Sequence, residues 1–157
     1  MQKITPFLWF DTQAEEAARF YVSLFKNASI GQISRYGDAG PGPKGQAMTV
    51  SFELDGLKFT TLNGGPIYKF TEAISLQIDC ADQAEIDHLW SNLTADGGEG
   101  GRCGWLKDRF GLSWQIVPAN IAALVGGDDP AKSQRAMQAM MQMGKLDVAA
   151  LERARAG

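Results

Sequence analysis

The sequence predicts an α+β fold of two βαβββ modules followed by a helical tail. Three observations support this prediction. Several short segments alternate apolar and polar residues as strands do, two others carry apolar residues at helical spacing, and the order of the segments repeats. Gln13-Ala14-Glu15 recurs as Gln83-Ala84-Glu85, a shift of 83 − 13 = 70, and Gly56-Leu57 matches Gly111-Leu112, a shift of 111 − 56 = 55. A repeat of this kind indicates two similar modules.

The first module is expected at about residues 4–66. It begins with a strand over residues 4–10. A helix over residues 13–25 follows, because Ala and aromatic residues recur there at helical spacing, and either Asp11 or Thr12 can cap it. Three strands are expected after the helix, over residues 28–36, 48–54 and 57–62.

Two turn signals connect these strands. The Gly- and Pro-rich run 37–45 is predicted to be a mobile loop. Asp55-Gly56 is a hairpin signal, so the strands beside it should pair antiparallel. Glu53 lies on the polar face of the strand before this turn, which makes it the one obvious candidate for a general base, although we favour simple exposure on the open side of the sheet.

The second module, at about residues 73–118, repeats the order with a strand over 73–80 and a helix over 83–93. The glycine cluster 97–101 then reads as a helix C-cap and flexible connector. Residues 108–111 are predicted to form a turn, with Lys107 and Asp108 as turn and surface groups.

The strand expected over residues 112–117 should have two different faces. Trp114 and Ile116 point to one side, which we predict to be core, and Ser113 and Gln115 point to the other. The tail, residues 119–157, should be helical and pack on the same domain as the modules, with Asp129 and Asp147 as N-caps and a methionine-rich stripe over 136–143 that covers the sheet or a partner.

Composition excludes several classes of protein. The formal net charge of -3 and the pI near 5.1 argue against a nucleic-acid-binding protein. No apolar run approaches the roughly 20 residues of a membrane helix, and no apolar signal region follows the N-terminus, so we expect a cytoplasmic protein without a membrane partner. Cys80 and Cys103 are expected to be buried free thiols.

Four motifs in this chain resemble those of a known superfamily: ITPFLWFD (residues 4–11), LNGGP (62–66), ISLQIDC (74–80) and CGWLKDRFGLSWQIVP (103–118). Together with the repeat, they are similar to the PhnB-like branch of the vicinal oxygen chelate (glyoxalase/bleomycin resistance protein/dioxygenase) superfamily, many members of which carry the label 3-demethylubiquinone-9 3-methyltransferase domain. The resemblance extends to the helical tail. It implies a curved mixed sheet of eight strands around a cleft, with the helices outside, and a homodimer.

The superfamily's metalloenzymes place His, Glu or Gln ligands on the first and last strand of each module. The resemblance maps these positions to Thr5, Pro6 or Phe7, to Thr60, to Ala73, Ile74 or Ser75, and to Gln115. A catalytic divalent ion needs about three ligands drawn from imidazole, carboxylate or thiolate groups. We therefore expect no metal and no cofactor, and His88 is expected to lie on a helix surface.

The residues expected to line the cleft follow from the alternation of side chains along each strand, because every second side chain points to the same face. The candidate ligand-binding residues are Phe7, Trp9, Ser75, Gln77, Ser113 and Gln115.

Three interpretations of function remain open: a metal-independent protein that binds or sequesters a small molecule, an enzyme of the superfamily with an unplaced metal site, or the methyltransferase that the label implies. We favour the first, because Ser, Thr, Gln and aromatic side chains suit a small organic ligand. No strand, glycine-rich turn and helix of the usual S-adenosylmethionine type occurs in the sequence.

Overall fold

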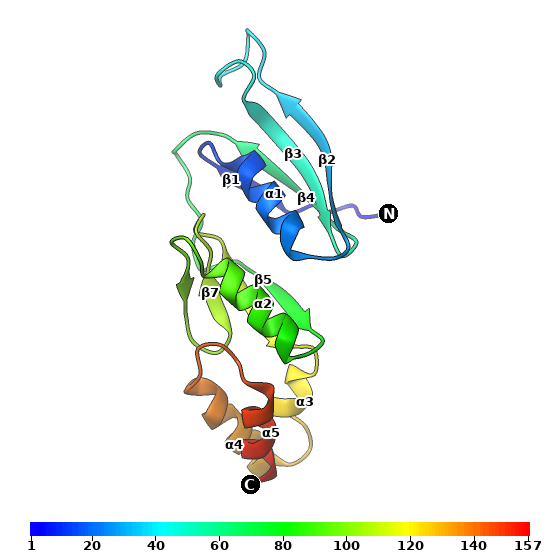
Figure 1. Ribbon diagram of the computed structural model, residues 1–157, viewed down its shortest axis with the longest axis vertical. Helices are drawn as coiled ribbons and strands as arrows, with labels where there is room; N and C mark the ends of the chain where they lie inside the picture. The colour runs from blue at the N-terminus through cyan, green and yellow to red at the C-terminus, as the bar shows by residue number, and fades with distance from the viewer. The chain divides into compact units, whose positions relative to one another are not determined.

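A computed structural model describes all residues, Met1–Gly157, and its chain forms two compact units, Met1–Phe70 and Thr71–Gly157 (Figure 1). In the first unit, β1 and β4 run parallel, whereas β4, β3 and β2 pair antiparallel in the sheet order β1-β4-β3-β2. The helix α1 lies across one face of this sheet. The elements are β1 (Phe7–Phe10), α1 (Ala14–Leu24), β2 (Ala28–Arg35), β3 (Ala47–Leu54) and β4 (Leu57–Asn63).

The second unit repeats this arrangement. Its sheet has the order β5-β8-β7-β6, with β5 parallel to β8 and the other neighbours antiparallel, and α2 packs against β5, β7 and β8. The two βαβββ modules predicted from the sequence are thereby confirmed. The elements are β5 (Ser75–Cys80), α2 (Gln83–Leu93), β6 (Glu99–Gly100), β7 (Trp105–Lys107) and β8 (Ser113–Pro118).

The strand register confirms the internal repeat residue by residue. Phe7 lies opposite Thr60 in the parallel pair of the first module, and Gln77 lies opposite Gln115 in the parallel pair of the second. The shifts are 77 − 7 = 70 and 115 − 60 = 55. They equal the two shifts found in the sequence, so positions can be compared between the modules through them.

Each sheet buries the side chains that face its helix. In the first unit the rings of Phe52 and Phe59 stack at 5.0 Å, and Phe52 also lies 6.1 Å from the ring of Tyr21 on α1. All three residues are less than 5% exposed. Alternation along β3 predicted this face, because apolar side chains two residues apart point to the same side of a strand.

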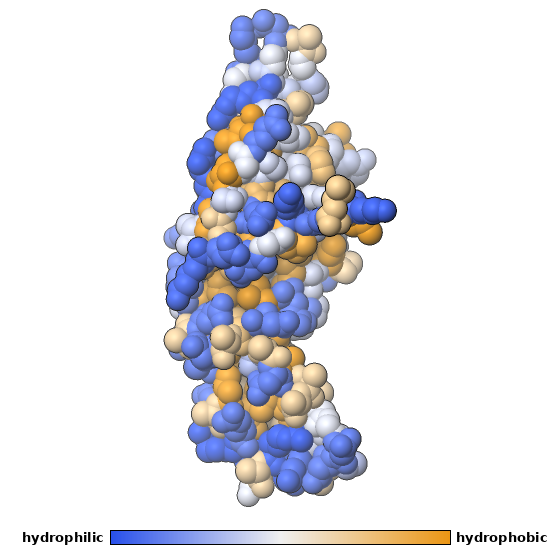
Figure 2. All heavy atoms as spheres, turned by 90° about the vertical axis from the view of Figure 1, so that its right-hand side faces the viewer, coloured by the Kyte–Doolittle hydropathy of each residue, from blue (hydrophilic) through white to orange (hydrophobic).

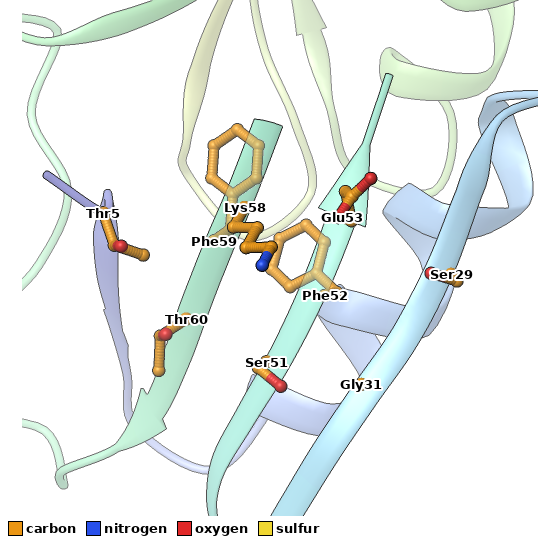
Figure 3. A pocket seen from close by; sticks show the side chains of 9 residues that line it. All are labelled: Thr5, Ser29, Gly31, Ser51, Phe52, Glu53, Lys58, Phe59 and Thr60. Atoms are coloured by element: carbon orange, nitrogen blue, oxygen red, sulfur yellow. The ribbon is translucent and has the colours of Figure 1, made fainter. Parts of the chain in front are cut away.

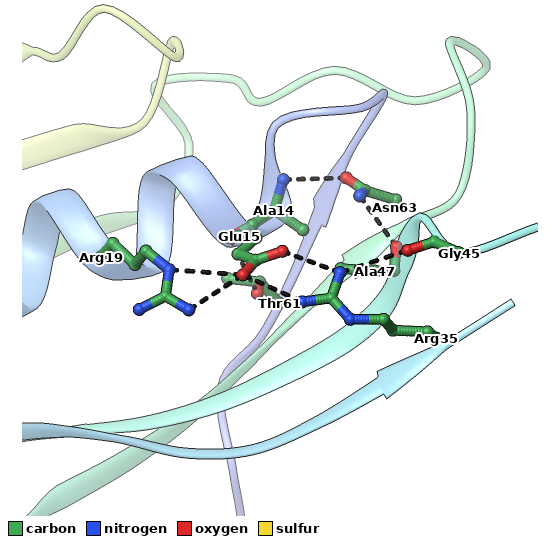
Figure 4. Close-up of polar contacts among 8 residues, drawn as sticks. All are labelled: Ala14, Glu15, Arg19, Arg35, Gly45, Ala47, Thr61 and Asn63. Carbon is green, nitrogen blue, oxygen red and sulfur yellow. Dashed lines mark hydrogen bonds and ion pairs between the residues drawn. The ribbon is translucent and has the colours of Figure 1, made fainter. Parts of the chain in front are cut away.

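The start of α1 is capped from a distance. Neither Asp11 nor Thr12 caps it, and the N-cap residue Gln13 makes no side-chain cap bond, so that prediction was wrong. Instead, the Asn63 Oδ1 accepts a hydrogen bond from the Ala14 amide at 2.8 Å, and the Asn63 Nδ2 donates to the Ala47 carbonyl at 2.9 Å (Figure 4). The physical reason is that Asn63 ends β4 next to the helix N-terminus and can satisfy an otherwise unpaired amide there.

The loop between β2 and β3 contains no regular element, as predicted, but its base is tied to the fold. The Gly45 amide donates to the Tyr36 carbonyl at 2.9 Å, and Arg35 donates to the Gly45 carbonyl at 3.2 Å. Arg35 also pairs with Glu15 of α1, and together with Arg19 it lowers the pKa of that carboxyl (Figure 4). Mobility of the loop stays a prediction.

The glycine cluster 97–101 is not simply a connector, and this prediction was wrong in part. Glu99–Gly100 forms β6, which pairs with β7 at the edge of the second sheet. A side chain on Gly100 would lie 2.8 Å from the Trp90 ring, and one on Gly101 would lie 2.9 Å from the Trp105 carbonyl. The glycines therefore allow a close approach of the backbone at this edge.

The tail contains α3 (Ile121–Val125), α4 (Pro130–Met141) and α5 (Val148–Ala156), which pack against one another. Asp129 and Asp147 cap α4 and α5, as predicted. The tail is joined to the second module by backbone bonds of 2.9 Å from the Cys103 amide to Met143 and from the Gly104 amide to Gly144.

The methionine-rich stripe of the tail is only partly buried. Ala136 is fully buried, but Met137 and Met141 are 38% and 55% exposed. Figure 2 shows that apolar residues lie between polar ones on the surface in view. No helix of the structure has the length and apolar character needed to cross a membrane.

Candidate binding sites on the helix-free sheet faces

Each sheet has a face turned away from the helix of its own module, which we call the helix-free face. In the second module it carries the polar residues expected from strand parity. Ser75 lies opposite Ser113 and Gln77 opposite Gln115, and the Gln115 Nε2 donates to the Ser75 Oγ at 2.9 Å. Trp114, on the other face of β8, is 2% exposed. The structure thus brings these four predicted residues together.

Phe7 and Trp9 are the two predicted site residues of the first unit. Phe7 is 58% exposed and lies opposite Thr60. The Trp9 indole donates to the Gly65 carbonyl at 2.9 Å and meets the Tyr68 ring edge to face at 5.0 Å. The two residues are two positions apart on β1 and so lie on the same face of that strand, although neither lines the cavity of the first module. That they share a cleft with the four residues of the second unit stays a prediction.

The helix-free face of the first module contains a cavity of about 320 Å³ (Figure 3). Glu53, the candidate general base, lies at this cavity directly opposite Lys58, and no ion pair joins the two side chains. The remaining wall is formed mainly by hydroxyl groups, whereas the rings of Phe52 and Phe59 are buried and pack toward α1. The lining residues are Thr5, Ser29, Gly31, Ser51, Phe52, Glu53, Lys58, Phe59 and Thr60.

The second module has a smaller cavity, of about 240 Å³, at the edge of its sheet. Lys107 pairs with Glu72 at 2.5 Å, which raises the pKa of the lysine and lowers that of the carboxyl. Glu99 lies opposite Lys107 across β6 and β7. The lining residues are Glu72, Glu99, Gly100, Gly101, Trp105, Leu106, Lys107 and Ser113.

These two cavities occupy equivalent positions in the repeat. Ser29 of the first corresponds to Glu99 of the second, since 99 − 29 = 70, and Lys58 corresponds to Ser113, since 113 − 58 = 55. Sequence patterns pointed to Ser113 and Glu53 but not to Lys58, Glu72 or Glu99. The repeat shift connects Ser29 with Glu99, whereas nothing in the sequence indicates that Glu72 reaches Lys107.

The positions that correspond to metal ligands in the superfamily do not fit a divalent ion. Phe7 and Thr60 are neighbours in the first module, and Ser75 and Gln115 in the second, so the nearby donors are hydroxyls and one amide. No group of three or more His, Cys, Asp or Glu side chains is placed to hold a metal ion. His88 lies on α2, within 3.3 Å of the Asn92 side chain.

The turn before β8 is held by a buried carboxylate. The Asp108 Oδ1 accepts from the Phe110 and Leu112 amides at 2.9 and 3.0 Å, and its Oδ2 accepts from the Trp114 indole at 2.9 Å. The predicted turn is confirmed, but Asp108 is only 2% exposed, so its prediction as a surface group was wrong. Burial is possible because these three donors stabilise the carboxylate.

Cys80 is buried as expected, whereas Cys103 is only half-buried. Burial raises the pKa of the Cys80 thiol to about 12. Because only a thiolate attacks a disulfide reagent, we expect one rapidly reacting thiol in the native protein and two after unfolding. Titration with a chromogenic disulfide at pH 8 measures both numbers. A Cys103→Ser variant should lose the rapid phase, and its retention in that variant would show that Cys80 is accessible.

Comparisons with known proteins agree with the fold. A PhnB protein from Bacillus cereus is 38% identical, with a TM-score of 0.70 over 75% of this chain and 100% of its own. The protein PA1353 from Pseudomonas aeruginosa is 21% identical, with a TM-score of 0.63 over 75% and 98%. The fosfomycin resistance protein FosX from Listeria monocytogenes shares the fold at 17% identity, with a TM-score of 0.52 over 78% and 94%.

The repeated βαβββ modules and the likeness to the PhnB and FosX structures show that the chain has the fold of the vicinal oxygen chelate superfamily. The family model described as 3-demethylubiquinone-9 3-methyltransferase matches residues 2–117. The chain therefore belongs to this PhnB-like family. The match ends before the helical tail, although the sequence resemblance was expected to include it. No curated protein matches the chain.

Proposed function

We propose that the protein binds a small organic molecule on the helix-free faces of its sheets without the help of a divalent metal. The observation that carries this proposal is the pair of equivalent cavities, one in each module, whose walls combine hydroxyl, aromatic and charged groups. Small-molecule sites typically have such walls, with a few polar groups that orient the ligand. The nearby superfamily ligand positions offer Phe7, Thr60, Ser75 and Gln115, which suit hydrogen bonding and packing better than metal ligation.

A thermal-shift screen of small organic molecules in the presence of a chelator tests this proposal. A ligand whose free concentration is about a hundred times its Kd stabilises the folded protein by about 2.7 kcal/mol. This stabilisation raises the Tm by several degrees. Thr60→Val removes a hydroxyl group from the wall of the first cavity, and Gln115→Ala removes an amide from the helix-free face of the second module, so at least one of them should reduce the shift. Shifts that occur only after Mn²⁺ or Zn²⁺ is added would contradict metal-independent binding.

Methyl transfer is the second candidate, and the description of the matching family model favours it. In this chain the glycine cluster 97–101 leads into the short strand β6 and not into a helix, so it lacks the helix N-terminus of the usual S-adenosylmethionine site. Calorimetric titration with S-adenosylmethionine distinguishes the two candidates. Saturable binding of one cofactor per chain would favour the methyltransferase over our proposal.

The homodimer and the cytoplasmic location stay predictions.

A further inference from the structure

The cavity of the second module contains a buried hydroxyl that lacks a partner. Ser113 is 1% exposed. Its Oγ is buried and makes no hydrogen bond within the protein. Leaving a buried polar group unpaired usually costs about 1–3 kcal/mol, so such a group calls for a physical explanation. Because Ser113 lines the cavity, a bound molecule could supply the missing hydrogen bond.

The charges around this cavity favour a positive ligand. Two carboxylates, Glu72 and Glu99, lie beside the single ammonium group of Lys107. Glu72 is already paired with Lys107, whereas no ion pair engages Glu99. Glu99 lies opposite the same lysine, so two carboxylates share one ammonium group and the cavity wall keeps an excess of one negative charge.

One aromatic side chain and the backbone of two glycines complete the wall of the second-module cavity. Trp105 is 38% exposed and shares the helix-free face of β7 with Lys107. An exposed indole attracts cations and flat groups through its π face. Gly100 and Gly101 contribute backbone to the wall, while the Trp90 ring and the Trp105 carbonyl fill the space that their side chains would take.

We propose that the second-module cavity binds a small planar organic cation, with its N–H groups shared between the Glu99 carboxylate and the Ser113 hydroxyl and its flat face against Trp105. This assignment rests on the proposed function and adds the chemical class of the ligand. The first-module cavity differs at the corresponding places, with Ser29 in place of Glu99 and Lys58 in place of Ser113. The two cavities are thus expected to prefer different charges.

Three probes of nearly equal shape test which ligand charge the second-module cavity prefers. They are benzamidine, a cation; benzamide, a neutral compound; and benzoate, an anion. Titrations of the full chain followed by amide NMR signals should show benzamidine binding about tenfold or more tightly than the other two, because charge-assisted hydrogen bonds are roughly twice as strong as neutral ones. The amide signals of Gly100 and Gly101 should move. Equal or tighter binding of benzamide or benzoate, movement confined to other signals, or no binding of benzamidine would overturn the proposal.

Two variants test whether Ser113 and Glu99 bind the cation. Ser113→Ala should raise the Tm of the free protein, because it removes an unpaired buried hydroxyl, and should weaken benzamidine binding several-fold. Glu99→Gln should weaken benzamidine about tenfold and leave benzamide unchanged. Glu152→Gln, the same charge change at an exposed site on α5, serves as the control and should alter neither affinity. A Ser113→Ala variant that binds benzamidine as well as the wild type would overturn the assignment.

The outcomes also separate this inference from the function on which it rests. A neutral or anionic molecule from the thermal-shift screen that moves the same Gly100 and Gly101 signals would overturn the cationic class and support the binding function. If no compound of the screen stabilises the protein and benzamidine does not bind, both proposals fail.

Discussion

Replacing Asp108 with alanine is expected to lower the free energy of unfolding by about 3–5 kcal/mol. The change removes a carboxylate that accepts hydrogen bonds from the Phe110 amide, the Leu112 amide and the Trp114 indole. Leu112 and Trp114 are both buried, so their N–H groups would lose a partner where water cannot easily replace it. Chemical denaturation monitored by tryptophan fluorescence measures the change.

Two further variants show whether the indole bond contributes as the structure indicates. Asp108→Asn keeps one oxygen for the backbone amides but presents an NH₂ group to the Trp114 indole, so it should cost less than alanine. Trp114→Phe removes the indole N–H, and the double variant should show a coupling energy of at least about 0.5 kcal/mol. Additive effects would mean that the bond contributes little. Asp38→Ala, at an exposed loop position, should change stability by no more than about 0.5 kcal/mol.

Trp114→Ala is expected to destabilise the protein by about 3–5 kcal/mol as a large-to-small change in the core. The side chain is 2% exposed and lies on the face of β8 that α2 covers. Gln115→Ala, one residue further along the same strand, should change stability by about 1 kcal/mol or less, because Gln115 is half-buried and makes one hydrogen bond with Ser75. Its effect should appear in ligand binding.

Thermal and denaturant unfolding of both variants measures this difference between the faces of one strand. The two substitutions form a matched pair, since both shorten a large side chain to alanine at neighbouring positions. If Gln115→Ala proved the more destabilising of the two, the helix-free face would be part of a core, and the assignment of Ser75, Gln77, Ser113 and Gln115 to a binding surface would be wrong.

Much of the fold could be predicted because its signals are local or repeated. Alternation in β3 and β8 identified the buried faces, and Asp55-Gly56 identified the hairpin between β3 and β4. The recurrence of Gln13-Ala14-Glu15 seventy residues later predicted the second module from the sequence alone. Strand parity also placed Ser75, Gln77, Ser113 and Gln115 on one face, although their role in binding rests on the experiments proposed above.

The missed features depend on contacts between distant residues. Asn63 caps α1 from 49 residues away, and local capping rules concern only the neighbours of the helix start. Asp108 looks like an ordinary turn residue in the sequence, and nothing local indicates that the Trp114 indole will donate a hydrogen bond to its carboxylate in the core. Glu72 reaches Lys107 from the segment between the modules, a contact that no periodic pattern encodes.

The metal content of the purified protein tests the central claim most directly. Elemental analysis for Zn, Mn, Fe and Ni after extensive dialysis without chelator should find far less than one ion per chain, because the positions around Phe7, Thr60, Ser75 and Gln115 provide no set of imidazole, carboxylate or thiolate ligands. One tightly bound ion per chain, retained through dialysis, would contradict a metal-independent binding protein.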